Sequence, residues 1–514
     1  MRRRTLSRLT AVPALVLIAA VISAAFLFTD PRPAEAHHLC GATGSPFGPF
    51  NLETYEANDY KNTYARTMEL AGFNQLLPDI PSFALPRLTT GDRAAGSSVS
   101  ADAYIPPVLL KAIAWMESGW AQASYDPLVD YGEVGPVLVS HDCGYGIMQV
   151  TSGMQNISGV PSLDQAMIGG HYAFNIARGA EILADKWNMG PDYRPIVGAR
   201  DFSIIENWYY ALWGYNGFAF KNHPLNPAYS STRVAFSCGP DTDGLGHDRS
   251  QYPYQELILG CAANPPVRTG TPLWPAQEVH LPELSNPTFA GPLQLENWTP
   301  CSQDFQCTAM DIPTPNTNHQ DPTTLTVDRS AVLGAPGLAI SANQIAVTRE
   351  APAATLTIWN TGTGVLSWRA TASALWLHLS SPGGVALGPD LGERAAALTI
   401  TVDTAALGTD AGAATVTIES LFGTGVPVAV AVSMPASSPP DPTPSPAPTP
   451  PCPGNLDSVQ ALRILRYVAN LETCGQPSDD VNCDGQVNAL DALAILRHTA
   501  ALPAGVPAGC PPLG

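Results

Sequence analysis

A proline-rich segment near the carboxyl end limits the fold of this chain more than any other feature. Residues 436–453 carry proline at almost every second position and no large apolar side chain. Such a segment is extended and semi-rigid, and it keeps its neighbours apart. A chain of 514 residues is also too long for one core. We therefore expect several domains, with residues 454–514 forming a small one beyond this linker.

The first residues have the pattern of an export signal. Four arginines among the first eight residues precede an apolar run from Ala11 to Phe28, and Ala34-Glu35-Ala36 follows. A positive flank, an apolar stretch and a small-x-small site predict a signal peptide over residues 1–36. An uncleaved anchor is the alternative, because the run is long. The expected location is extracellular or at the cell envelope.

Charge and cysteine content narrow the class of protein further. The net charge is −19 and no basic block follows the N-terminus, which argues against nucleic acid as a partner. Six cysteines lie between Cys40 and Cys307, and four lie between Cys452 and Cys510. Even numbers in an exported chain predict disulfides within each group.

Residues 328–435 change to short segments of alternating polarity. Residues 354–359, 397–402 and 414–418 alternate polar and apolar side chains, with glycine, asparagine, aspartate and proline between them. This pattern is typical of an all-β, immunoglobulin-like sandwich.

A helix with a carboxyl on its apolar face is predicted after Pro106-Pro107. Leu109, Ile113 and Glu117 follow at helical spacing, and Gly119 is expected to end the helix. A carboxyl on a buried stripe has a raised pKa, which a general acid acting on a glycosidic oxygen needs. On this helix alone, a boundary glutamate that turns to solvent is the better interpretation.

Three later stretches change that interpretation. Residues 144–150 form a glycine-bearing turn running into a strand-like piece, and residues 175–183 open a helix whose internal Gly179 permits close packing. Residues 211–217 end a helix in a Tyr-Asn-Gly turn. With Glu117-Ser118 ahead of them, these stretches resemble the lytic transglycosylase domain of the lysozyme-like superfamily, glycoside hydrolase family 23. The resemblance covers about residues 103–225.

This resemblance implies an α-rich, lysozyme-like catalytic domain over residues 37–327. It implies cleavage of the MurNAc–GlcNAc β-1,4 bond of peptidoglycan glycan strands with formation of 1,6-anhydro-MurNAc, in cell-wall remodelling or lysis. Glu117 would be both acid and base, without a catalytic cofactor, and Tyr215 would help to orient it. The residues implied to bind substrate or shape the cleft are Ser118, Tyr145, Met148, Gln149, Tyr215 and Asn216. The sequence departs from the usual family pattern at two places. The family usually has a Met-Pro pair where this chain has Thr151-Ser152, and alanine where it has Gly214. These differences affect details of the cleft and not the chemistry.

Two alternatives remain open for this region. The first is a goose-type hydrolytic muramidase, in which water replaces the muramyl hydroxyl. A second carboxylate could come from the loop 123–142, although solvated side chains are the favoured interpretation for its Asp126, Asp130, Glu133 and Asp142. The second alternative is a non-catalytic scaffold that binds the cell envelope or carbohydrate.

The sandwich region carries a resemblance of its own. Its stretch 359–368, Trp-Asn-Thr-Gly-Thr-Gly-Val-Leu-Ser-Trp, and the later Leu375-Trp376-Leu377 look like the BACON family of immunoglobulin-like domains. That family is often attached to carbohydrate-active enzymes. We favour a structural spacer over a glycan-binding role.

The tail contains an internal repeat. Residues 461–466 match residues 492–497, which predicts two helices that pack through Leu462, Ile464 and Leu465 and their counterparts Leu493, Ile495 and Leu496.

The second copy of the repeat includes a loop with calcium-ligand spacing. Its oxygen donors and the central glycine suit Ca²⁺, with the carbonyl of Gln486 as one ligand. The predicted ligands are Asp480, Asn482, Asp484, Gln486, Asn488 and Asp491. The tail therefore resembles a type I dockerin with an EF-hand-like loop. The first copy of the repeat lacks these ligands, because their positions are occupied by Thr449, Pro451, Pro453 and Gln460. We therefore expect one structural Ca²⁺. A cohesin-type protein is the partner that the resemblance implies.

Overall fold

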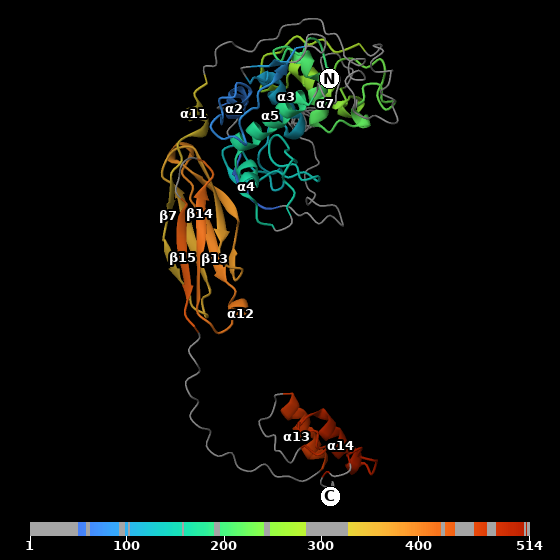
Figure 1. The fold of residues 1–514 in the computed structure, drawn as a ribbon, viewed down its shortest axis with the longest axis vertical. Helices are drawn as coiled ribbons and strands as arrows, with labels where there is room; N and C mark the ends of the chain where they lie inside the picture. The colour runs from blue at the N-terminus through green and yellow to red at the C-terminus, as the bar shows by residue number, and fades with distance from the viewer. Residues whose placement is uncertain are drawn as a thin grey trace, which may run out of the picture. The chain divides into compact units, whose positions relative to one another are not determined.

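The computed structural model describes most of the chain, in two parts. Its described residues are 50–57, 62–91, 98–100, 103–156, 159–189, 196–240, 247–283, 327–422, 427–436, 457–469, 480–507 and 510. By their contacts they belong to two compact units, Met1–Ser437 and Ser438–Gly514 (Figure 1). The predicted signal peptide and nearly all of the predicted linker lie outside the described residues. No helix in the described ranges is long and apolar enough to cross a bilayer.

The first part of the first unit is mainly helical, in agreement with the predicted α-rich region. Its helices are α2 (Thr63–Gly72), α3 (Pro107–Ser118), α4 (Leu163–Gly170), α5 (Tyr172–Asn188), α7 (Tyr209–Tyr215) and α8 (Tyr254–Ala263), with 3-10 turns η2 (Ile205–Trp208), η3 (Phe220–Asn222) and η4 (Arg249–Gln251). Short strands pair as β1 (Glu53–Tyr55) with β4 (Val134–Pro136), β2 (Thr89–Thr90) with β3 (Ser98–Val99), and β5 (Val267–Arg268) with β6 (Thr271–Pro272).

Helix α3 has the limits that its sequence predicts. Pro106 and Pro107 occupy its first positions, where a missing N–H costs nothing. Leu109 and Ile113 are fully buried. Gly119 follows the last turn with φ 62°, a left-handed conformation that favours glycine. The helix therefore ends where Glu117 leaves the core.

Residues 144–150 form a compact turn and not the expected strand-like piece. Tyr145 and Val150 exchange backbone hydrogen bonds across it. The Ile147 N–H donates to Gln122 Oε1 at 3.0 Å, and the Met148 N–H donates to Asn175 Oδ1 at 2.8 Å. Side-chain oxygens thus accept the hydrogen bonds that the carbonyl groups of a neighbouring strand would otherwise accept from these backbone N–H groups.

Gly179 permits close packing of α5, as its sequence predicts, and the structure shows that the partner is this turn. A Cβ added at Gly179 would lie 2.8 Å from three side-chain atoms of Met148. Helix α5 begins at Tyr172, three residues before the expected Asn175, because the side chain of His171 caps it by accepting from the Ala173 N–H.

Two sheets form the predicted β-rich region. One has the order β12-β10-β14-β15-β8 and the other β11-β13-β9-β7; all pairs are antiparallel except the parallel pair of β15 and β8. The strands are β7 (Leu338–Ile340), β8 (Gln344–Ala346), β9 (Ala353–Asn360), β10 (Val365–Ala372), β11 (Leu377–Leu379), β12 (Gly383–Leu387), β13 (Ala396–Val402), β14 (Gly412–Ser420) and β15 (Val428–Met434). The three alternating segments of the sequence lie in β9, β13 and β14, and their apolar residues fill the core between the sheets. Short helices α11 (Arg329–Leu333) and α12 (Thr404–Leu407) complete this region.

The helical part and the sandwich share buried contacts. Phe422, just after β14, stacks on Phe174 of α5 with ring centroids 4.4 Å apart. Ser367 on β10 donates to the carbonyl of Gly170 at 2.9 Å, and the Tyr172 hydroxyl donates to the carbonyl of Val332 at 2.9 Å. The largest apolar core of the described residues therefore continues from the helices into the sandwich.

The second unit is a pair of helices, α13 (Ser458–Val468) and α14 (Ala489–Thr499). Ile464 and Ile495 are buried between them, as predicted. The four leucines expected beside them are 40–55% exposed: Leu462, Leu465, Leu493 and Leu496. Two short helices bury only one narrow stripe each, and alanines 461 and 492 occupy the positions next to the isoleucines.

Disulfides fall within each predicted group of cysteines. Cys238 pairs with Cys261 in the first unit, and Cys483 pairs with Cys510 in the second. Cys143 is also disulfide-bonded.

Candidate active site

A pocket of about 680 Å³ opens at the carboxyl end of α3. Segments far apart in the sequence contribute its charged and polar side chains. The main ones are Glu117, Asp142, Gln149, Tyr215, Lys221 and Arg249.

Glu117 is a carboxyl of this pocket whose pKa is strongly raised. Its side chain is only partly exposed. Loss of hydration raises its pKa from 4.5 to about 7, and the negative charge of Asp142 adds to the rise. The Tyr254 hydroxyl, Arg249 and Lys221 act in the opposite direction. Glu117 can therefore hold its proton near neutral pH and still ionise, as an acid that later acts as a base must.

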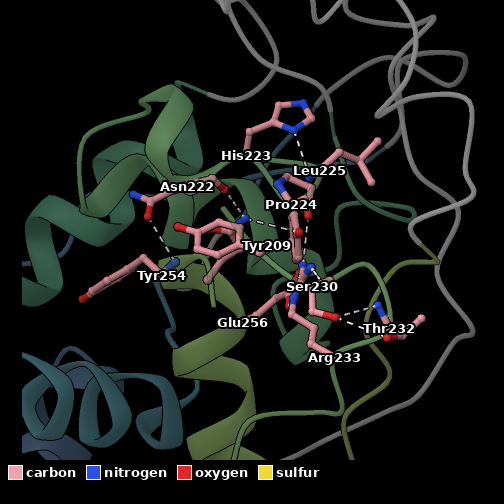
Figure 2. Close-up of polar contacts among 12 residues, drawn as sticks. Tyr209, Asn222, His223, Pro224, Leu225, Ser230, Thr232, Arg233, Tyr254 and Glu256 are labelled. Atoms are coloured by element: carbon pink, nitrogen blue, oxygen red, sulfur yellow. Dashed lines mark hydrogen bonds and ion pairs between the residues drawn. The ribbon is translucent and has the colours of Figure 1, made fainter. Parts of the chain in front are cut away.

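Tyr254 donates its hydroxyl to Glu117 Oε1 and fixes the direction of the carboxyl. The tyrosine is the first residue of α8, and Figure 2 shows the polar network around this helix start. The Tyr254 N–H donates to Asn222 Oδ1 at 3.2 Å. In the same first turn of α8, Arg233 binds both oxygens of the buried Glu256 at 2.5 and 2.7 Å. The network holds η3, the loop after it and α8 together, and so it positions Tyr254 over the pocket.

Arg249 joins the pocket to the end of α3. Its Nη2 donates to the carbonyl of Met116, the residue before Glu117, at 2.6 Å. Lys221, on η3, brings a second positive charge to the pocket. Both cations favour the ionised form of Glu117 and thus limit the rise of its pKa.

The residues implied by the sequence resemblance divide into two groups. Gln149, Tyr215 and Asn216 line the pocket with Glu117. Ser118, Tyr145 and Met148 are almost fully buried and do not line it. The Ser118 hydroxyl lies 2.8 Å from the carbonyl of Ile147, so this side chain ties α3 to the turn 144–150. These three residues support the pocket from behind.

The tyrosine that contacts Glu117 is not the expected one. The hydroxyl of Tyr215 donates to the carbonyl of Met148 at 3.0 Å, while Tyr254 donates to the carboxyl. The two rings are nearly parallel, with centroids 6.4 Å apart. Tyr215 therefore supports Tyr254 and the turn 144–150. Sequence reasoning missed Tyr254, Arg249 and Lys221, because nothing in their local pattern distinguishes them from ordinary helix-start or loop residues.

Substitution Tyr254→Phe tests the role of this hydrogen bond. The hydroxyl stabilises ionised Glu117, so its loss should raise the pKa of the carboxyl and move the alkaline limb of kcat/KM to higher pH. We expect kcat to fall about tenfold, since the carboxyl loses its fixed direction. The pH–rate profile is the measurement. Tyr209→Phe, which removes another buried hydroxyl beside α8, is the control and should leave the limb in place. An unmoved limb in Tyr254→Phe would contradict the assignment.

The loop predicted to bind calcium precedes α14. Asp491 is fully buried, and its two oxygens accept from the Asn482 N–H at 3.1 Å and the Asn488 N–H at 2.8 Å. Asp480 accepts from the N–H groups of Asp484 and Gly485, and Gly485 has φ 85° at the sharp turn. These hydrogen bonds from backbone N–H groups orient the carboxylates, whose oxygens keep further lone pairs that can bind a cation.

The donors of this loop are all oxygen atoms, which fits a hard cation such as Ca²⁺. Within the described ranges, no three His, Cys, Asp or Glu side chains form a metal-binding group. A cation in this loop would therefore also depend on the oxygens of Asn482 and Asn488 and on the Gln486 carbonyl.

Comparison with known proteins identifies the sandwich region. Residues 337–433, which run from β7 into β15, match the family described as viral BACON domain. The chain therefore has a BACON-like domain at the predicted place. No curated protein matches the chain.

Three solved structures that the chain resembles each match over about a fifth of the chain. The periplasmic chaperone SfaE is 11% identical, with TM-score 0.18, over 22% of this chain and 60% of the chaperone. A Bacteroides ovatus GH5 xyloglucanase is 20% identical, with TM-score 0.15, over 20% of this chain and 19% of the enzyme. WR4, a C. elegans MSP family member, is 8% identical, with TM-score 0.15, over 20% of this chain and 97% of WR4. The chain thus spans less than two thirds of the first two, and TM-scores this low carry no functional argument.

Proposed function

We propose that this chain is a secreted lytic transglycosylase that cleaves the MurNAc–GlcNAc β-1,4 bond of peptidoglycan. The observation that carries the proposal is Glu117, a carboxyl with a pKa near 7 that faces a pocket together with Gln149 and Tyr215. A protonated carboxyl can protonate the bridging oxygen, and the resulting carboxylate can accept a proton from the muramyl 6-hydroxyl. The product would be a 1,6-anhydro ring.

Hydrolysis is the second candidate, and Asp142 favours it. This carboxylate lines the same pocket, and its charge acts on Glu117. Ser140 donates to Asp142 Oδ1 at 2.6 Å and so holds the side chain in place. A second oriented carboxylate could activate a water molecule, as an inverting glycosidase requires.

The ends of the released fragments distinguish the two candidates. Transglycosylation leaves 1,6-anhydro-MurNAc, which borohydride does not reduce, whereas hydrolysis leaves a reducible end. Mass spectrometry of muropeptides released from purified cell walls makes the distinction. Reducible ends alone would exclude transglycosylation. A protein that releases no fragments would instead support the third alternative, a non-catalytic protein that binds the envelope.

For the second unit we propose a dockerin-like role that depends on one calcium ion. The oxygen donors of residues 480–491 support this proposal, and a cohesin-type protein is the partner it implies. The exposed leucines of α13 and α14 are available for such a contact.

Calcium should bind with a stoichiometry near one and stabilise the second unit. Metal binding stabilises only the folded loop, by about 2.7 kcal/mol when free calcium is 100-fold above its Kd. Asp484→Ala should abolish the calcium-dependent rise in melting temperature without changing cell-wall cleavage. Gln460→Ala, in the first copy of the repeat, should keep the rise. Isothermal titration that finds two sites would contradict the single-site proposal.

A further inference from the structure

The charged side chains around the Glu117 pocket are not balanced. Lys221 and Arg249 line it together with two carboxylates, Glu117 and Asp142. When Glu117 holds the proton that a general acid needs, two cations face one carboxylate. The chain as a whole has a net charge of −19. The reactive form of the pocket therefore has a local positive charge within an acidic protein.

The two cations have different surroundings. Arg249 donates to the carbonyl of Met116, so one of its functions is to hold the end of α3. The side chain of Lys221 is exposed, and its ammonium forms no hydrogen bond or ion pair within the described part of the chain. The backbone around it is fixed, because the Tyr229 hydroxyl donates to the Lys221 carbonyl and Asn222 donates to Asn216 Oδ1 at 3.0 Å. A fixed backbone thus presents an unpaired charge at the pocket.

We infer that Lys221 binds a carboxylate of the substrate and makes the pocket selective for acidic glycans. This inference deepens the proposed function and rests on it. An ammonium is a point charge that accepts a carboxylate from many directions, which suits a substituent that rotates about an ether bond. In a peptidoglycan strand, N-acetylglucosamine has no such group. Each muramyl residue has a lactyl ether that ends in a carboxylate or in a peptide that carries carboxylates.

Three forms of one substrate test the inference. The first is glycan strands stripped of peptide, which expose the lactyl carboxylate. The second is the same strands with that carboxylate converted to a neutral methylamide, and the third is peptide-bearing strands. The full-length protein is assayed as wild type, Lys221→Met and Lys221→Arg. Arg87→Met, which removes an exposed cation outside the pocket, is the matched control.

We expect Lys221→Met to raise KM for carboxylate-bearing strands about fivefold to tenfold, with kcat changed by less than about twofold. At a pH well below 7, where Glu117 is protonated with or without Lys221, methylamide strands should show the same KM for this variant and wild type. Lys221→Arg should restore most of the affinity, and Arg87→Met should match wild type. A change in KM on stripped strands would identify the lactyl carboxylate as the group that Lys221 binds. A change confined to peptide-bearing strands would identify a carboxylate of the peptide instead.

Equal losses on methylamide and carboxylate strands would overturn the inference, because Lys221 would then act through Glu117 or through the fold. An unchanged KM on every strand would overturn it as well. In both cases wild type still cleaves, so the proposed function survives. A wild-type protein that cleaves none of the strands would instead reject the proposed function, and the inference with it.

Discussion

Glu117→Gln is expected to reduce peptidoglycan cleavage by about a thousandfold, because the amide can neither donate nor accept the proton that cleavage requires. Gln has nearly the shape of Glu and can still accept from the Tyr254 hydroxyl, so the pocket should keep its geometry. The rate of release of soluble muropeptides is the measurement. Asp130→Asn, the same exchange at an exposed position, should retain wild-type activity. A Glu117→Gln variant that keeps more than about a tenth of the activity would exclude Glu117 as the acid.

The acidity of Glu117 also predicts how activity depends on pH. The acid must start protonated, and its pKa is raised from 4.5 to about 7. We therefore expect kcat/KM to fall as pH rises through about 7.

The same shift predicts that Glu117→Gln is more stable than wild type at alkaline pH. The folded chain holds the proton more tightly than the unfolded chain, so ionisation of Glu117 destabilises the fold. Below the unfolded pKa of 4.5 both states are protonated and the substitution has no such effect. The gain in melting temperature should begin above this pH, grow up to about pH 7 and be complete above it. An equal gain at all pH values would contradict the raised pKa.

Local patterns were enough to predict α3 and its limits, whereas the choice of Glu117 as the candidate acid also needed the family resemblance of the later stretches. The spacing of Leu109, Ile113 and Glu117 and the glycine after the helix are properties of one segment, and the structure has the helix at those residues. The alternating segments of the sandwich were predictable for the same reason. Period and end signals act over a few residues, so a single sequence contains them in full.

The rest of the pocket could not be predicted in this way. Tyr254 meets Glu117 across 137 residues of chain, and Arg249 meets Met116 across 133. Only the tertiary packing of η4 and α8 against the end of α3 brings these side chains together. The leucines of the tail show why a correct local pattern can still give a wrong burial prediction. They have helical periodicity, but the periodicity does not reveal how wide a stripe two short helices can bury, and these leucines are partly exposed.

The contact between the helical part and the sandwich predicts the largest change in stability. Phe422→Ala should lower the free energy of unfolding of the first unit by about 3 kcal/mol, since it removes a buried aromatic ring and leaves a cavity. The ring stacks on Phe174, and its edge contact with His171 has a centroid distance of 4.4 Å. His171 is 1% exposed; its Nδ1 accepts from the Ala173 N–H, while its Nε2 has no hydrogen-bond partner in the described residues and depends on apolar packing. Water entering the cavity would therefore also reach the residue that caps α5.

Because α5 carries Gly179 and Asn175, which support the turn 144–150, the damage should extend to the pocket. We expect Phe422→Ala to lose activity at a lower temperature than wild type, in step with thermal unfolding followed by tryptophan fluorescence. Trp359→Ala, which removes a partly exposed ring from the same sandwich, should cost less than about 1 kcal/mol. If both variants lost the same stability, or if the helical part of Phe422→Ala unfolded as in wild type, the two parts would not share a core. A single shifted transition in Phe422→Ala would mean that the BACON-like domain supports the fold on which the pocket depends.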